Sequence, residues 1–142
     1  MATYYIQGLE KTLKSLKKFD AQLQKKILRQ AMRAALKPIK ATAKADAPVL
    51  TGQTRAAIKI KAGKQRKKGC IRLNVVIGEG DYKGDQFYGS FQEYGYHNHK
   101  TGKLIPGKHF MKKAFDSQKG NAKNIVEVMV ASGISSAIAS SK

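Results

Sequence analysis

Glu93 is the acidic residue whose surroundings suggest chemistry, because it lies within an aromatic segment, residues 87–95. A carboxylate that is partly buried among aromatic rings needs a cationic or amide partner to offset its desolvation. Arg55 is a candidate partner, since a guanidinium can bind a carboxylate through two parallel hydrogen bonds. We therefore expect either an Arg55–Glu93 ion pair, which would join two distant segments, or two exposed side chains.

The sequence predicts that this protein is not an enzyme. A single carboxylate rarely suffices for acid–base catalysis, which usually needs a second titratable group. No serine or cysteine lies in the context of a nucleophile elbow, and Gly78-Glu79-Gly80 lacks the lysine and the spacing of a phosphate-binding loop. We expect no catalytic residue and no cofactor.

The three histidines, His97, His99 and His109, could be considered as metal ligands. A zinc site needs a well-spaced third and fourth ligand, and Cys70 lies far from them in the sequence. Surface loops commonly carry lone histidines, so we expect no metal site.

The formal net charge of +19 is concentrated in the first half of the chain. Residues 1–72 contain 19 Lys and Arg against 3 Asp and Glu, whereas residues 73–142 contain 9 against 6. Such asymmetry indicates either a surface that contacts a polyanion or a solvated helix face. No aromatic residue interrupts the basic ones between Ala21 and Lys68, so any DNA contact would be to phosphates without sequence preference. The candidate contacts lie in one basic loop: Lys64, Arg66, Lys67 and Lys68.

Apolar residues at intervals of three and four predict a helix near 8–18 and a long helix near 20–45, with Asp20 as the N-cap of the second. Pro38 should bend the long helix, and the residue before Pro48 should end it. Thr51 is expected to cap a single helical turn through Arg55.

Strands are expected at 58–61 and 70–77, forming an antiparallel hairpin. The aromatic spacing of residues 86–95 favours a helix, followed by a loop at 96–108. A final helix opens at Phe110, with a break around Lys119-Gly120, and resumes at 122–140. The fold class is α+β, with the long N-terminal and the C-terminal helix packed on a small antiparallel sheet, and we expect one domain, 1–142.

One cysteine allows no internal disulfide, which fits a reducing compartment. No apolar run approaches the roughly 20 residues that span a bilayer, and the N-terminus lacks the pattern of a secretory signal. We therefore expect synthesis in the cytoplasm and no membrane contact.

Three motifs in this order resemble the small neck and tail-completion proteins of long-tailed bacteriophages, which include the minor tail protein Z type. They are an Ala-Pro-x-x-Thr-Gly-x-x-Arg-x-x-Ile turn, an aromatic-x-x-Glu-aromatic-Gly segment, and a Phe-x-x-x-Ala start of the last helix. The matching residues are Pro48, Thr51, Gly52, Arg55, Ile58, Tyr88, Glu93, Gly95, Phe110 and Ala114. The sequence departs from the family pattern at Thr54 (usually leucine), Tyr96 (commonly threonine) and His109 (usually proline).

The resemblance implies a structural virion protein at the head–tail junction, made in the host cytoplasm. It implies a homo-oligomeric ring of six copies that contacts the tail tube, tail terminator or head-closure proteins. Loops 62–69 and 96–108 are the expected contact surfaces, ordered on assembly. The alternative is a small basic protein that binds nucleic acid without sequence preference.

Overall fold

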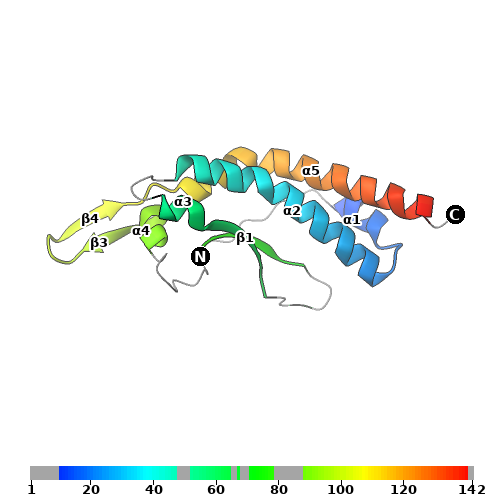
Figure 1. Ribbon diagram of the computed structural model, residues 1–142, viewed down its shortest axis with the longest axis horizontal. Coiled ribbons are helices and arrows are strands. Elements are labelled where there is room, and N and C mark those ends of the chain that lie inside the picture. The colour runs from blue at the N-terminus through cyan, green and yellow to red at the C-terminus, as the bar shows by residue number, and fades with distance from the viewer. Residues whose placement is uncertain (1–9, 48–51, 65–66, 68–70, 79–87, 141–142) are drawn as a thin grey trace. The chain divides into compact units, whose positions relative to one another are not determined.

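The computed structural model describes residues 10–47, 52–64, 67, 71–78 and 88–140 (Figure 1). The helices and strands, in chain order, are α1 (Glu10–Leu16), α2 (Ala21–Asp46), α3 (Gln53–Ala57), β1 (Ile58–Ala62), β2 (Leu73–Ile77), α4 (Tyr88–Tyr94), β3 (Gly95–Asn98), β4 (Lys103–Pro106) and α5 (Phe110–Ser140). Two long helices and two small antiparallel sheets confirm the α+β class.

The chain forms two compact units, each built from separated segments. The first contains the described residues of 1–38, 62–73 and 119–142, and the second those of 39–61 and 74–118. Both α2 and α5 contribute a part to each unit. The expectation of one domain stays a prediction.

α2 begins and ends where local sequence signals place it. The Oδ1 atom of Asp20 accepts hydrogen bonds from the backbone N–H groups of Gln22 (2.9 Å) and Leu23 (3.0 Å), which confirms Asp20 as the N-cap. The helix continues past Pro38 and ends at Asp46, two residues before Pro48. Its buried positions recur every four residues: Ile27, Ala31, Ala35, Ile39 and Ala43.

α5 is one continuous helix from Phe110 to Ser140, so the expected break at Lys119-Gly120 is wrong. A glycine weakens a helix by about 1 kcal/mol but does not end it when the residues on both sides are buried at helical spacing. In the first unit, Gly133 of α5 lies against Ile27 of α2, and a Cβ at Gly133 would lie 2.8 Å from Ile27 Cγ2. The missing side chain lets the two helices approach closely there.

β1 and β2 form the predicted hairpin of strands. Its ladder is bracketed by two backbone bonds, from Gly63 N–H to the Arg72 carbonyl and from Gly78 N–H to the Ala57 carbonyl (both 2.9 Å). In the second unit, Ile58 and Val76 bury one side chain from each strand. Part of the expected second strand, including Cys70, lies outside the described residues.

Residues 96–108 contain a second hairpin, so the expected loop there is wrong. β3 and β4 pair antiparallel, with Gly95 opposite Pro106 and Asn98 opposite Lys103. The Asn98 side chain accepts hydrogen bonds from the N–H groups of Lys100 (3.0 Å) and Thr101 (3.3 Å), and Gly102 adopts φ 68°. An Asn that bonds two residues ahead and a glycine at positive φ together form the turn.

Candidate functional site: the Glu93 junction

Glu93 caps the N-terminus of α5 from another helix. It lies near the end of α4 and is only 4% exposed. Its Oε2 accepts a hydrogen bond from the N–H of Met111 (2.8 Å), and its Oε1 accepts one from the N–H of Lys112 (3.1 Å). Met111 and Lys112 are the second and third residues of α5, whose N–H groups have no partner within the helix. Glu93 therefore caps the N-terminus of α5, a role that usually belongs to a side chain directly before the helix.

Two backbone bonds reinforce this contact. Lys108 N–H donates to the Gln92 carbonyl (2.8 Å), and His109 N–H donates to the Glu93 carbonyl (3.1 Å). The start of α5 is thus held to the end of α4 by four hydrogen bonds, two to the carboxylate and two to backbone. We call this set the Glu93 junction.

The carboxylate also suits the electrostatics of the position. The aligned peptide dipoles of a helix place about half a positive charge at its N-terminus, which favours an anion there. A buried carboxylate without such donors would be strongly unfavourable. Two backbone N–H groups and the helix dipole together take the place of the cationic or amide side-chain partner.

Arg55 has a different environment from the one expected. Its Nη2 donates to the carbonyl of Ala45 at 3.5 Å, and its Nε is buried without a hydrogen-bond partner. The Arg55 side chain therefore bonds to the end of α2, and Glu93 bonds to α5. Neither alternative that we considered holds: the two side chains form no ion pair, and Glu93 is not exposed.

His109, where the resemblance led us to expect proline, has a backbone conformation that matters to the junction. It is the non-glycine residue with positive φ (51°) in the described chain. A proline cannot adopt this φ, and it has no N–H to donate to the Glu93 carbonyl. In this chain, the junction therefore depends on a residue other than proline at 109.

Two glycines let the backbone of the second hairpin approach the junction. Gly95 follows α4 with φ 83°, as expected for a glycine at a helix C-terminus, and a Cβ there would overlap the Ile105 carbonyl. A Cβ at Gly107 would overlap the carbonyl of Glu93. Any side chain at either position would push β4 away from the end of α4.

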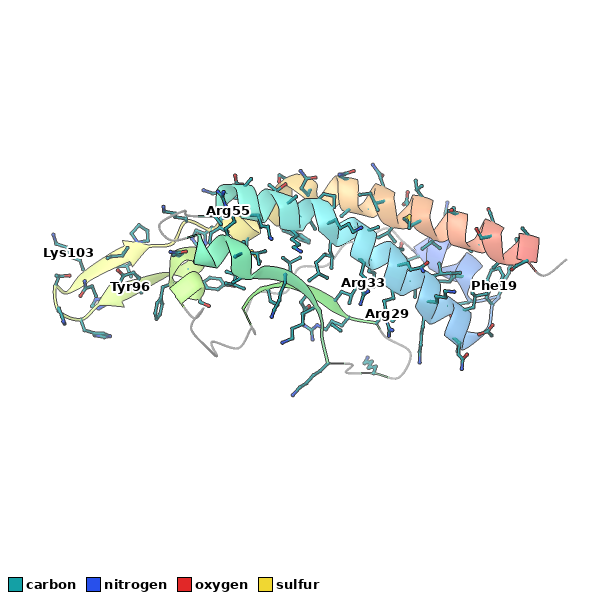
Figure 2. All side chains as sticks on the ribbon, in the orientation of Figure 1. Phe19, Arg29, Arg33, Arg55, Tyr96 and Lys103 are labelled. Carbon is teal, nitrogen blue, oxygen red and sulfur yellow. The ribbon has the colours of Figure 1, made fainter. Side chains whose placement is uncertain are left out.

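Apolar side chains gather on this hairpin and the adjoining helix. The rings of Phe91 and Tyr96 lie 5.6 Å apart, and Leu104 is 72% exposed. Figure 2 places Tyr96 and Lys103 on the two strands of the hairpin. We define the hairpin surface as the exposed large apolar residues of α4, β3 and β4, namely Phe91, Tyr94, Tyr96, Leu104 and Ile105. Tyr96 and Ile105 are opposite each other in the register and share one face of the hairpin, whereas Leu104, the neighbour of Ile105, lies on the other face. Exposed apolar patches mark interaction sites on soluble proteins.

Apart from Arg55, described above, the predicted motif residues fall into four groups. Ile58, Phe110 and Ala114 are core residues of the second unit, each at most 1% exposed. Gly52 precedes α3 in the left-handed conformation, with φ 72°. Tyr88 begins α4, Glu93 forms the junction, and Gly95 lies against β4 beside it. Pro48 and Thr51 lie outside the described residues, and α3 has Gly52 at its N-cap position.

Of the predicted basic loop, Lys64 and Lys67 are described, and both are exposed. Arg66 and Lys68 lie outside the described residues. The sequence analysis did not predict His109 as part of the junction, Gly107 as its close neighbour, or Leu104 and Ile105 as surface residues. Gly107 was the one residue whose type could have indicated a close approach of two backbones there.

The described residues contain no group of three or more His, Cys, Asp or Glu side chains that could hold a metal ion. The rings of His97 and His99 lie 5.4 Å apart on the second hairpin. Within the same described ranges, no helix is long and apolar enough to cross a membrane.

Comparison with known proteins identifies the family. The model of the HK97-gp10-like family, described as a tail component of bacteriophage HK97-gp10 type, matches residues 9–95, more than half of the chain. No curated protein and no solved structure matches. The chain belongs to the HK97-gp10-like family of bacteriophage tail components, which are structural virion proteins and not enzymes.

Proposed function

We propose that this tail component is a neck or tail-completion subunit, similar to the minor tail protein Z type, that forms a six-membered ring at the head–tail junction. The ring would complete the tail and allow it to join the filled head. Membership of a tail-component family supports a place in the virion. The observation that carries the proposal is the hairpin surface, which is apolar, exposed and fixed to α5 by the Glu93 junction.

A second copy of the chain is the proposed occupant of the hairpin surface. In the described chain, β3 and β4 pair only with each other, so each leaves one edge without a strand partner. An unpaired edge is a template for a strand from another chain, and an isolated two-stranded sheet is marginal in water. In a ring, each subunit contacts its neighbour through two different surfaces, so one hairpin per copy suffices.

The alternative function, a DNA-coating protein, explains the charge but leaves the hairpin surface unexplained. A phosphate-binding protein needs exposed cations, and it gains nothing from an apolar hairpin with a buried carboxylate at its base. The tail-subunit proposal accounts for the apolar hairpin and for the buried Glu93 carboxylate at its base.

Leu104→Asp tests the proposed contact. Leu104 is 72% exposed, so the change should alter the free energy of unfolding by less than about 0.5 kcal/mol. It should nevertheless abolish incorporation into tails, because it places a charge in an apolar contact. Val128→Asp is the matched control: Val128 is 67% exposed on α5 and belongs to the first unit, whereas the hairpin belongs to the second.

The assay is complementation of a phage that lacks the gene, followed by electron microscopy of the particles. We expect unjoined heads and tails without the protein and with Leu104→Asp, and joined particles with Val128→Asp. Normal joined particles in the absence of this protein would refute the proposed role in head–tail joining. Joined particles with Leu104→Asp would refute only the hairpin contact.

A further inference from the structure

The long helix α2 carries a row of cations opposite its buried side. Lys25, Arg29, Arg33 and Lys37 recur every four residues, and all four are exposed. We call this row the cationic ridge. The buried row at Ile27, Ala31 and Ala35 is offset from it by two residues, which is about 200° around a helix. Figure 2 labels Arg29 and Arg33 on the same side of α2.

The surface beside the ridge is open and lacks acids. An open hollow of about 410 Å³ lies on this face of α2, lined by Gln22, Lys25, Lys26, Arg29, Gln30 and Arg33. Every lining side chain can donate hydrogen bonds, and none is acidic or aromatic. The chain has no Asp or Glu from residue 21 to residue 45, so the ridge has no anionic partner within its helix.

The ridge is not explained by helix stability. Like charges four residues apart repel each other on a helix surface, and the ridge contains three such pairs in succession. A solvated helix face would normally alternate the sign of its charges to gain stability. The arrangement therefore suits binding of a polyanion.

The first unit as a whole, ridge included, carries most of the positive charge of the chain. Its segments contain 17 Lys and Arg against 3 Asp and Glu, whereas those of the second unit contain 11 against 6. The exposed Lys64 and Lys67 also belong to the first unit. The positive potential of the chain is thus concentrated on the unit that carries the ridge.

We propose that the cationic ridge binds the phosphate backbone of double-stranded DNA without sequence preference. The four residues span about 18 Å of helix, and a DNA strand carries a phosphate about every 3.4 Å of its axis. About five phosphates therefore face four cations. The ridge has no aromatic side chain for base stacking. An anionic membrane is a poorer match, because a membrane-surface helix needs an exposed apolar face and that of α2 is buried.

The test compares DNA binding by two variants that lose the same charge. One replaces Lys25, Arg29, Arg33 and Lys37 with Gln. The matched control replaces four exposed lysines of the second unit with Gln: Lys100, Lys103, Lys108 and Lys113. Binding to a short labelled duplex is measured by fluorescence anisotropy over a series of salt concentrations.

Each lost phosphate contact lowers the slope of log affinity against log salt by about 0.9. We expect the magnitude of the salt slope to fall by about 3–4 in the ridge variant and by less than about 1 in the control. Equal losses in both variants would mean that only net charge matters, and would overturn the proposal. An unchanged slope in the ridge variant would also overturn it.

Two further measurements keep the test decisive. The single variants Arg29→Gln and Arg33→Gln should each lower the slope by about 0.9, which gives an answer even if the fourfold variant is unstable. Binding to phosphatidylserine vesicles is measured in parallel. If the ridge substitutions weaken binding to vesicles but not to duplex DNA, the proposal is wrong.

Discussion

Replacing Glu93 with Gln should loosen α5 from α4 while leaving the shape of the side chain intact. The carboxylate accepts two backbone hydrogen bonds, at 2.8 and 3.1 Å. The amide of Gln has one oxygen, so it can keep one bond but turns an NH₂ group toward the other N–H. One lost bond to a charged acceptor costs about 1.5–3 kcal/mol, and losing the anion at the helix N-terminus costs a further 0.3–1 kcal/mol or so.

Lys112 is exposed, so water can replace part of its lost bond. We therefore expect Glu93→Gln to lower the free energy of unfolding by about 2 kcal/mol. For a chain of this length, that corresponds to a fall in Tm of roughly 8 °C. Glu93→Ala should cost about 3 kcal/mol, because both N–H groups lose their acceptor.

Thermal unfolding and amide hydrogen exchange together test this account. Asp116→Asn is the control, because it neutralises an exposed carboxylate further along the same helix and should change stability by less than about 0.5 kcal/mol. In Glu93→Gln, the amides of Met111 and Lys112 should lose about 30-fold in protection. A loss of Tm with unchanged exchange at these two amides would show that Glu93 stabilises the protein in another way.

Two further predictions concern backbone positions. Gly120→Ala should stabilise the protein by about 0.5–1 kcal/mol, because a Cβ there meets open space. Gly133→Ala should destabilise it by about 1 kcal/mol net, because the Cβ overlaps Ile27. Chemical denaturation of both variants measures the two changes in the free energy of unfolding, and changes of the same sign would contradict the close approach of α5 to α2. His109→Pro should cost more than about 1 kcal/mol, since φ 51° and the N–H bond to Glu93 are both lost. An equal or raised Tm would refute this role of residue 109.

The helices were predictable because their signals are local. The Asp20 cap, the four-residue apolar spacing of α2 and the residue before Pro48 together set both ends of α2. β1 was predictable for the same reason, since its alternation spans only residues 58–61 and one of its faces is buried at Ile58.

The second hairpin escaped prediction because its sequence carries little burial pattern. The strands of most sheets alternate between buried and exposed residues, but every residue of β4 is exposed. Only Asn98 and Gly102 signalled a turn there. The partner of Glu93 was missed because Met111 lies 18 residues away and contributes a backbone N–H, which the sequence does not single out.

The distribution of charge suggests how one small chain can both assemble and meet DNA. Each copy carries a formal charge of +19, so neighbouring copies repel each other, and repulsion between exposed charges extends over about 8–10 Å at physiological salt. The apolar hairpin belongs to the unit with the smaller excess of cations, and the cationic ridge belongs to the other. Each copy would therefore offer its less charged unit, through the hairpin, to the neighbouring copy. Neutralisation of the ridge by DNA would in turn weaken the repulsion between copies.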